Sequence, residues 1–521
     1  MSSSLRARNA VSRRRSAWIG VLIALVAVLA AALHAWRIAD VPHGFFVDET
    51  SIGYNAWQIV QTGRDEHGVA WPLYFRAFGE YKNPVYVYFL AAIYEVFGLS
   101  ETATRAASFA AWLIGSLVMF GLFRRLTNDR AVLLYAVLCL GFTPWLFTLS
   151  RISFEVISLL PLLALHLWAV HRAYEGGNTR WAVLAGLALG VAAYAYSTFR
   201  MLAPLHVLAV LLVYPRREYR GRHAWLIAGF IAAVLPLVAY VLAHADNLTS
   251  RFGELTYLHE PGTTAWDKAV TFAGRYVEYF GPDFLALHGD SIVRHHTGYG
   301  GQLLLATILL ALIGLMCAWR RGSSFTRLLV AGAAIAPLAA ALTRDHGHSL
   351  RAFSLVVFAL PLSVVGAIWL RERIGAAAVV LLTACAAVQG ALYTLDYFTR
   401  YAAATDVVFV SRGFEPALRA ALARSSGRVI VDERQIQPYI HALFYQEILA
   451  VEDGPAVRDR TVLVGREDAL RPGDAYVMFD PMFSCAGCRE GLPVRGLYAV
   501  KIAGADGRVS PSFAPAAGSG R

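Results

Sequence analysis

Two adjacent carboxylates, Asp48 and Glu49, follow the first hydrophobic run of the chain, residues 17–36. A carboxylate can take a proton from a hydroxyl group, and it can also cap a helix, because negative charge is favoured at a helix N-terminus. The segment VDETSIGYNAWQIVQTG (47–63) places apolar side chains on one helical face. The pair therefore predicts a general base or a helix cap, and the two roles are compatible.

Cationic and imidazole side chains follow at the ends of other apolar runs. Lys82 lies in FGEYKNPVYVY, before an apolar aromatic helix that starts at Pro84. It can extend to the lipid headgroups, or it can bind a lipid-linked phosphate in the low-dielectric setting of the bilayer surface. The further candidates are Glu155, Arg200, Arg294, His295, His296, His348 and Arg351. Ionisable residues at the edge of a span are costly, so their convergence favours an anion-binding site over solvated loops.

Metal and redox chemistry have weaker signals. His295-His296 and His346-x-His348 could bind Zn²⁺ or Mn²⁺ together with a carboxylate. No third ligand stands out in the sequence, so we expect no required metal or cofactor and keep a divalent metal as an alternative. Cys485 and Cys488 form CAGC, which predicts a local disulfide on the outside of the membrane.

The composition defines the broad class. Of the 521 residues, 57% are hydrophobic and 16% charged, whereas soluble domains carry about 25% charged residues. The chain is therefore predicted to be a polytopic membrane protein. Its net charge of +11 does not indicate nucleic-acid binding, because the basic residues cluster in short loops between apolar runs, as in cytoplasmic loops of membrane proteins.

About eleven apolar runs are candidates for membrane spans. After the first, they are 104–123, 131–149, 156–171, 181–197, 203–214, 224–244, 301–319, 327–342, 352–370 and 375–395. Alternate connections are short and rich in Arg, and the N-terminus is strongly basic. The N-terminus is thus predicted in the cytoplasm and the C-terminus outside.

Three regions follow from this topology. Residues 1–395 form the membrane region, with a large first external loop at 37–103 that contains interfacial helices. Residues 396–508 mix strand-like and amphipathic helical segments, which predicts a soluble extracytoplasmic α/β domain. Residues 509–521 are predicted to be a disordered tail.

Several segments resemble the polyprenyl-phosphate-dependent glycosyltransferases of the GT-C superfamily, such as the protein O-mannosyltransferases and lipid A aminoarabinose transferases. The resemblance is carried by VDETSIGYNAWQIVQTG, FGEYKNPVYVYF and SETATRAASFAAWL, which lie between residues 44 and 115. SRISFE, AYSTFRMLAP, FLALHGDSIVRHHTGYGGQL and GHSLRAFSLVVFALP extend it through most of the membrane region.

The resemblance implies a role for each matched residue. Asp48 is the expected general base, and Glu49 orients it or acts on it through its like charge. Lys82 would hold the donor phosphate, although Asn83 stands here where many relatives have proline. Glu155 is the candidate second acid. Phosphate contacts are expected from Arg200, His348 and Arg351.

The reaction implied is transfer of one sugar from a polyprenyl-phosphate donor to a hydroxyl of a lipid, polysaccharide or protein, with inversion, outside a bacterial inner membrane. Cations would stabilise the departing phosphate. Two other classes remain. A ligase or polymerase would move a whole glycan from a lipid diphosphate, and a flippase would favour paired halves with broken helices. A structural membrane protein with a sensing domain would leave the converging polar residues unexplained.

Overall fold

The computed structural model describes residues 2–244, 252–405, 409, 413–480, 497–503 and 509–512. The chain divides into two compact units. Unit 1 comprises Met1–Trp36, Ser108–Arg151 and Glu155–Asp396; unit 2 comprises Arg37–Ala107, Ile152–Phe154 and Tyr397–Arg521. The expected domain boundary at residue 396 lies beside the last segment of unit 2. Unit 2 also contains the whole of the expected first external loop.

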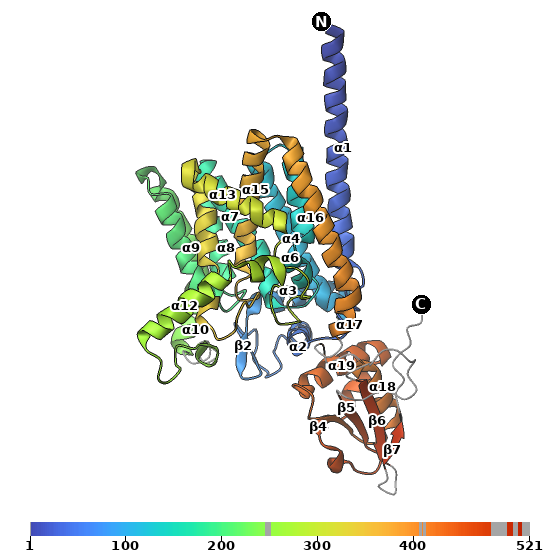
Figure 1. Ribbon diagram of the computed structural model, residues 1–521. Helices are drawn as coiled ribbons and strands as arrows, with labels where there is room; N and C mark the ends of the chain where they lie inside the picture. The colour runs from blue at the N-terminus through green and yellow to red at the C-terminus, as the bar shows by residue number, and fades with distance from the viewer. Residues whose placement is uncertain are drawn as a thin grey trace. The chain divides into compact units, whose positions relative to one another are not determined.

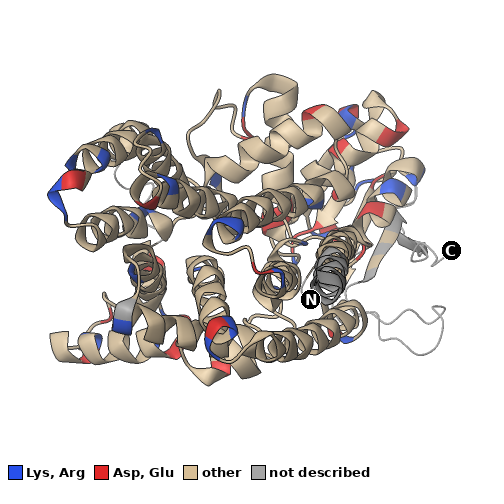
Figure 2. Ribbon diagram, turned by 90° about the horizontal axis from the view of Figure 1, so that it is seen from above, with Lys and Arg blue, Asp and Glu red and all other residues tan. Residues whose placement is uncertain are grey.

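Long apolar helices dominate the chain, as the sequence predicts (Figure 1). Within the described residues, seven helical stretches are long and apolar enough to cross a membrane: Trp18–Ala35, Glu101–Leu126, Glu155–Glu175, Arg217–Ala243, Ser324–Leu342, Ser354–Arg373 and Ala376–Ala404. Figure 2 shows long stretches of helix without Lys, Arg, Asp or Glu. The class of helical multi-pass membrane protein is confirmed.

Other expected spans correspond to shorter apolar helices. These are α5 (Arg130–Phe142), α8 (Arg180–Ala192), α9 (Phe199–Val213) and α13 (Leu305–Arg321). The expected run 131–149 breaks at Thr143, and α6 (Pro144–Leu149) begins with proline at its first position. Proline lacks a backbone N–H and is tolerated there but not inside a helix. The total of eleven spans stays a prediction.

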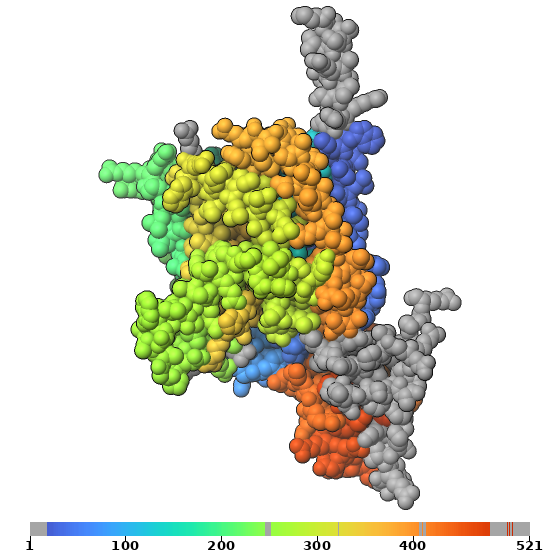
Figure 3. All heavy atoms as spheres, viewed as in Figure 1, coloured from blue at the N-terminus to red at the C-terminus, as the bar shows by residue number. Residues whose placement is uncertain are grey.

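The membrane region also contains the helices α1 (Ser2–Ala35), α4 (Glu101–Leu126), α7 (Leu159–Val170), α10 (Arg220–Ala243), α12 (Ala265–Glu278), α14 (Ser324–Ile335), α15 (Ser354–Arg373) and α16 (Ala376–Asp396). The short helices η1 (Glu155–Ser158) and η4 (Asp283–Leu287) lie in the connections before α7 and α13. Residues 252–304, drawn in green to yellow-green, cover part of the face seen in Figure 3.

Glycines allow pairs of membrane helices to approach closely. A Cβ on Gly366 of α15 would lie 1.9 Å from the Leu310 carbonyl oxygen of α13, and one on Gly314 would lie 2.2 Å from the Leu362 carbonyl oxygen. Gly186 of α8 faces α10 in the same way. Small residues at such crossings are typical of membrane proteins, because packing rather than the hydrophobic effect holds the helices together.

The first part of unit 2 carries the acidic pair and the lysine. Helix α2 (Val47–Thr62) ends at Gly63, whose φ of 69° is left-handed and favours glycine. A hairpin of β1 (Phe75–Ala77) and β2 (Glu80–Lys82) follows, and α3 (Pro84–Phe97) begins with proline at its first position. The 14 residues of α3 are too few for a perpendicular span.

The last part of unit 2 contains a sheet in the order β4-β3-β5-β6-β7. Its strands are β3 (Val429–Asp432), β4 (Val462–Gly465), β5 (Ala475–Asp480), β6 (Leu497–Ala503) and β7 (Val509–Ser512). Strand β3 is parallel to β4 and β5, and the pairs β5/β6 and β6/β7 are antiparallel. The expected disulfide of Cys485 and Cys488 and the tail beyond 512 lie outside the described residues.

Two helices accompany the sheet, α18 (Phe414–Arg424) and α19 (Pro438–Asp453). Helix α19 packs against α2. Trp57 Nε1 donates to Glu447 Oε2 at 2.9 Å, and the rings of Phe45 and Phe444 are 5.7 Å apart. The C-terminal part of unit 2 therefore supports α2, whose first turn carries the acidic pair.

Candidate functional site

Asp48 and Lys82, which are 34 residues apart in the chain, form an ion pair in unit 2. Lys82 Nζ donates to Asp48 Oδ1 at 2.5 Å and to Glu80 Oε1 at 2.8 Å. The lysine side chain is 10% exposed, whereas that of Asp48 is 32% exposed. We call Asp48, Glu80 and Lys82 the carboxylate–lysine cluster. It holds one carboxylate within reach of an incoming ligand beside a shielded cation.

Local structure fixes both partners of this contact. Asp48 lies in the first turn of α2, where the helix dipole favours its negative charge. Lys82 ends β2 and pairs in register with Phe75 of β1. Its Nζ lies 5.5 Å from the centre of the Phe78 ring, close enough for a cation–π contact.

Glu66 and Tyr439 both interact electrostatically with Lys82 of the carboxylate–lysine cluster. Glu66 and Asn55 form two hydrogen bonds, from Asn55 Nδ2 to Glu66 Oε1 at 3.1 Å and from the Glu66 backbone N–H to Asn55 Oδ1 at 3.0 Å. Burial raises the pKa of Glu66, and the charge of Lys82 acts in the opposite direction. Burial also raises the pKa of Tyr439 to about 12, and its hydroxyl senses the charges of both Glu66 and Lys82. Since Tyr439 belongs to α19, the C-terminal domain contributes to this environment.

Glu49, the second acid of the pair, has a different environment. Its side chain is fully buried and forms an ion pair with Arg105, in which Arg105 Nε lies 2.9 Å from Glu49 Oε1. The backbone N–H groups of Phe46 and Ser153 also donate to its carboxylate, each at 3.0 Å. A substrate cannot reach Glu49 in this arrangement. The geometry supports a positioning role for it beside Asp48.

Arg105 connects Glu49 to the turn between α1 and α2. Its guanidinium donates to the carbonyl oxygens of Ile38, Ala39, Pro42 and Gly44, at 3.2, 3.1, 2.7 and 2.5 Å. It also stacks over the Phe45 ring at 4.6 Å. One buried cation thus fixes the chain that leads into Asp48.

Arg151 performs a similar task at the end of α1, in unit 1. The contacts of Arg151 include the carbonyl oxygens of Leu33, His34 and Trp36, at 2.8, 2.7 and 2.8 Å. A cation at the C-terminal end of a helix is favoured by the dipole. Arg151 is fully buried. Its hydrogen bonds to these carbonyl oxygens cap the C-terminal end of α1.

The other expected site residues all belong to unit 1. Glu155 begins η1 and is 8% exposed. Arg351 Nη1 donates to Thr343 Oγ1 at 2.8 Å and to Asp345 Oδ2 at 2.5 Å. Thr198, two residues before Arg200 on α9, donates to the Arg351 carbonyl oxygen at 3.4 Å. The start of α9 and the connection before α15 therefore lie together, as a shared phosphate site would need.

His348 lies in a second buried group of unit 1, with Asp290 and His295. His295 Nδ1 and Asp290 Oδ2 are hydrogen-bonded at 2.9 Å, and the rings of His295 and His348 are 4.8 Å apart. Burial lowers the pKa of both imidazoles. Burial raises the pKa of Asp290, but the hydrogen bond and charge of His295 outweigh it and hold this pKa below its usual range.

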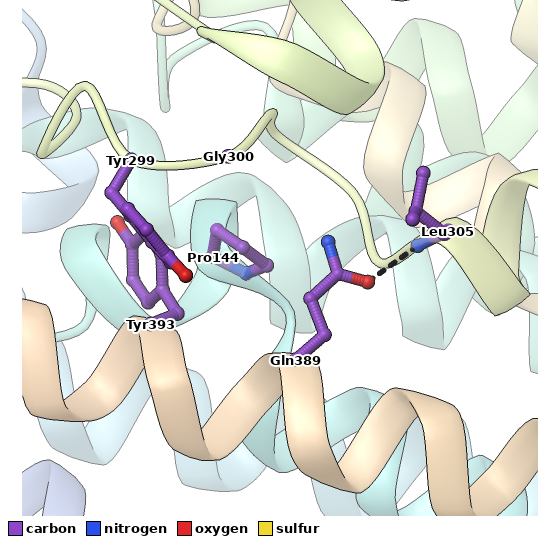
Figure 4. Close-up of a pocket in the computed structure, with 6 residues that line it drawn as sticks. All are labelled: Pro144, Tyr299, Gly300, Leu305, Gln389 and Tyr393. Atoms are coloured by element: carbon purple, nitrogen blue, oxygen red, sulfur yellow. Dashed lines mark hydrogen bonds between the residues drawn. The ribbon is translucent and has the colours of Figure 1, made fainter.

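A small pocket lies elsewhere in unit 1 (Figure 4). Its volume is about 140 Å³, and its lining consists of Pro144, Tyr299, Gly300, Leu305, Gln389 and Tyr393. Gln389 Oε1 accepts a hydrogen bond from the Leu305 backbone N–H at 2.8 Å. The pocket contains none of the expected site residues and is smaller than the roughly 300–1,000 Å³ of typical ligand pockets. It is not the candidate active site.

Sequence analysis missed several residues of these groups. Arg105 lies inside an apolar run. An ionisable residue in such a run indicates a functional or structural role, so the sequence could have identified it. Glu80 is two residues from Lys82, but only the structure shows that its carboxylate accepts a hydrogen bond from the Lys82 ammonium. Glu66 and Asp290 belong to no recognisable motif. Asn55 lies 11 residues from Glu66, and Asp290 contacts both His295, five residues away, and Ser349, 59 residues away.

Part of the chain is similar to a known family. Residues 81–242 match the sequence model of the family described as dolichyl-phosphate-mannose-protein mannosyltransferase. This segment includes Lys82, Glu155 and Arg200, and it ends before His348 and Arg351. None of the curated proteins matches the chain.

Two solved structures share the fold. ArnT from Cupriavidus metallidurans, bound to undecaprenyl phosphate, is 13% identical with a TM-score of 0.59, and the alignment covers 89% of this chain and 93% of that one. The oligosaccharyltransferase of Archaeoglobus fulgidus in its apo form is 13% identical with a TM-score of 0.51, covering 85% of this chain and 64% of that one.

The family match and the shared fold confirm the resemblance seen in the sequence. The match of residues 81–242 and the fold shared with ArnT and the oligosaccharyltransferase support a membrane glycosyltransferase of the GT-C type. The seven long apolar helices make it a multi-pass membrane protein.

Proposed function

We propose that this protein transfers a single sugar from a polyprenyl-phosphate donor to an acceptor hydroxyl, at the extracytoplasmic face of a bacterial inner membrane. The contact between Asp48 and Lys82 carries the proposal. It brings the residue expected to act on the acceptor to 2.5 Å from the residue expected to hold the donor phosphate. The alignment over most of ArnT, a protein solved with undecaprenyl phosphate, supports a donor of this chemistry.

The reaction needs one base and one cation. Asp48 takes the proton of the acceptor hydroxyl as the acceptor oxygen bonds to the anomeric carbon. The bond from that carbon to the phosphate oxygen breaks, and its electrons leave with polyprenyl phosphate. Attack opposite the leaving phosphate inverts the anomeric carbon. A positioned base contributes about 10²–10⁴-fold to such a step.

Lys82 stabilises the departing phosphate in this scheme. The donor phosphate competes with Glu80 for the ammonium, which keeps its bond to Asp48. The lysine charge thereby serves both reaction partners, since it sits beside the base and beside the leaving group. The sugar donor is already activated, so the scheme uses no nucleotide and no required cofactor.

The other site residues have supporting roles in the proposal. Glu49 positions Asp48 through the buried pair with Arg105. Glu155 is the proposed second acid, and Arg200, His348 and Arg351 are the proposed further contacts to phosphate. The acceptor is a lipid, polysaccharide or protein hydroxyl. The N-terminus lies in the cytoplasm and the C-terminal domain outside.

Purified full-length protein in nanodiscs tests this function. With a radiolabelled sugar on polyprenyl phosphate and an envelope extract as acceptor, label should leave the donor and free polyprenyl phosphate should appear. Transfer of a whole glycan from a lipid diphosphate would instead show a ligase or polymerase. Movement of the intact lipid between leaflets without bond cleavage would show a flippase. Either outcome overturns the proposal.

The donor role of Lys82 has a separate test. Lys82→Ala removes a charged hydrogen bond, worth about 1.5–3 kcal/mol, and should raise the donor Kd by about 10- to 100-fold. Lys268→Ala on α12 removes the same charge outside the cluster and should leave the Kd unchanged. An equal Kd for both variants would exclude the phosphate role.

A further inference from the structure

We infer that Asp290, His295 and His348 form a binding site for a divalent transition metal, with Zn²⁺ as the first choice. The three side chains are 2%, 1% and 5% exposed. One ligand atom from each lies within 4.8 Å of the other two. Two imidazoles and one carboxylate are a ligand set that suits Zn²⁺ and Mn²⁺. The site goes beyond the proposed transfer reaction, which uses no metal, and it would make His348 a metal ligand in place of a phosphate contact.

Two connections of unit 1 supply the ligands. Asp290 and His295 follow η4, and His348 lies between α14 and α15. The Ser349 backbone N–H and hydroxyl both donate to Asp290 Oδ2 at 2.7 Å, so the residue next to one ligand fixes another. The Ile292 backbone N–H donates a hydrogen bond to Asp290 Oδ1 at 2.8 Å. Such outer hydrogen bonds orient metal ligands in known sites.

The three side chains are close enough for one metal ion to bind them all. Two ligand atoms of a tetrahedral Zn²⁺ with bonds of about 2.1 Å lie about 3.4 Å apart. His295 Nδ1 and Asp290 Oδ2 are 2.9 Å apart, and all three ligand atoms lie within 4.8 Å of one another. Shifts of about 1.4 Å or less would bring them to the tetrahedral spacing.

His348 provides a second, independent observation. Its Nδ1 atom is buried and has no hydrogen-bond partner among the described residues. A buried ring nitrogen without a partner is unfavourable, and a metal ion bonds to such an atom directly.

Charges around the site decide what else the metal would bind. Asp290 contributes one negative charge, while the charges of Arg294 and Arg351 reach both imidazoles. Arg351 is balanced by Asp345 at 2.5 Å. With three protein ligands, an ion keeps at least one open position. The surrounding positive charge favours an anion there over a neutral ligand.

Metal content tests the site without reference to activity. Full-length protein stripped with a chelator, then incubated with Zn²⁺ and dialysed, should retain about one equivalent. X-ray absorption should show imidazole ligands, and the ion should raise the thermal midpoint. Asp290→Asn and His348→Ala should each lose the zinc and the thermal shift. His346→Ala, which removes an exposed imidazole two residues from His348, should keep both.

Two results would overturn the site. One is that wild-type protein retains no zinc after dialysis. The other is that wild-type protein, Asp290→Asn and His348→Ala retain equal amounts, since the ion would then be adventitious. If His348→Ala fails to fold, His348→Gln supplies the same comparison, and the wild-type chelation result still decides whether zinc binds.

Discussion

Asp48 and Glu49 are neighbours in the chain, but their side chains meet different surroundings. Successive helical residues point in directions about 100° apart. In the first turn of α2 this leaves Asp48 partly exposed beside Lys82, while Glu49 is fully buried against Arg105. The sequence predicts two acids at a membrane boundary. It does not separate the reacting acid from the positioning acid, because that depends on a partner 56 residues away.

Removing Arg105 should destabilise the protein strongly. Arg105→Met leaves the Glu49 carboxylate buried without its cation, and breaking a buried pair in this way costs about 3–5 kcal/mol. Thermal unfolding in detergent or nanodiscs measures the loss. The double variant Glu49→Met/Arg105→Met removes both charges and should recover part of it. A single variant that unfolds at the wild-type temperature would show that the pair does not hold α2 in place.

Glu66 should make stability depend on pH. Its pKa is raised in the folded protein by burial, so the unfolded chain releases this proton first, near its usual pKa of about 4.3. The contribution of Glu66 to the free energy of unfolding is therefore present at acid pH. It is lost as the pH rises through the pKa of Glu66 in the folded protein. Glu66→Gln keeps an acceptor for Asn55 but cannot ionise.

The measurement for Glu66 is a comparison of thermal midpoints at two pH values. The difference between Glu66→Gln and wild type should favour the variant more at pH 7 than at pH 4. If the difference in thermal midpoint between Glu66→Gln and wild type is the same at both pH values, burial does not raise the pKa of Glu66.

At the scale of elements, glycine contacts set how closely the membrane helices pack. Gly366 and Gly314 place α13 and α15 against each other with no room for a side chain. Gly366→Ala should therefore force the helices apart, and overpacking of this kind costs about 1–3 kcal/mol. Unfolding or detergent stability measures it.

Gly121→Ala on α4 is the matched control for this prediction. A Cβ there would meet nothing within 4 Å, and alanine is the better helix former by about 1 kcal/mol. This variant should be neutral or more stable. If Gly366→Ala were as stable as Gly121→Ala, the result would contradict the close contact between α13 and α15.

Elements differ in how far the sequence predicts them. Hydropathy locates the spans, because about 20 apolar residues are required to cross a bilayer. The helices α5 and α8 are shorter than the expected runs, since Pro144 ends one run and α8 stops before the polar YSTFR segment. The contact of Trp57 with Glu447 joins residues 390 apart, and no local pattern encodes such a pairing.

At the scale of the whole molecule, residues 37–107 and the C-terminal part from residue 397 belong to one compact unit. Helix α19 supports α2 and places Tyr439 within electrostatic range of Lys82. We propose from this that the C-terminal domain helps to shape the acceptor side of the site. Sequence analysis predicts this domain from a change in composition, but it could not assign the domain a place, because the segment carries no motif.

The central claim is that Asp48 acts as the base in sugar transfer from polyprenyl phosphate. Purified wild-type protein and Asp48→Asn should be compared for release of polyprenyl phosphate from a labelled donor, with donor binding measured in parallel. The variant should lose about 10²–10⁴-fold in transfer rate, while donor binding is retained, since Lys82 remains. Transfer by Asp48→Asn at the wild-type rate would contradict the account.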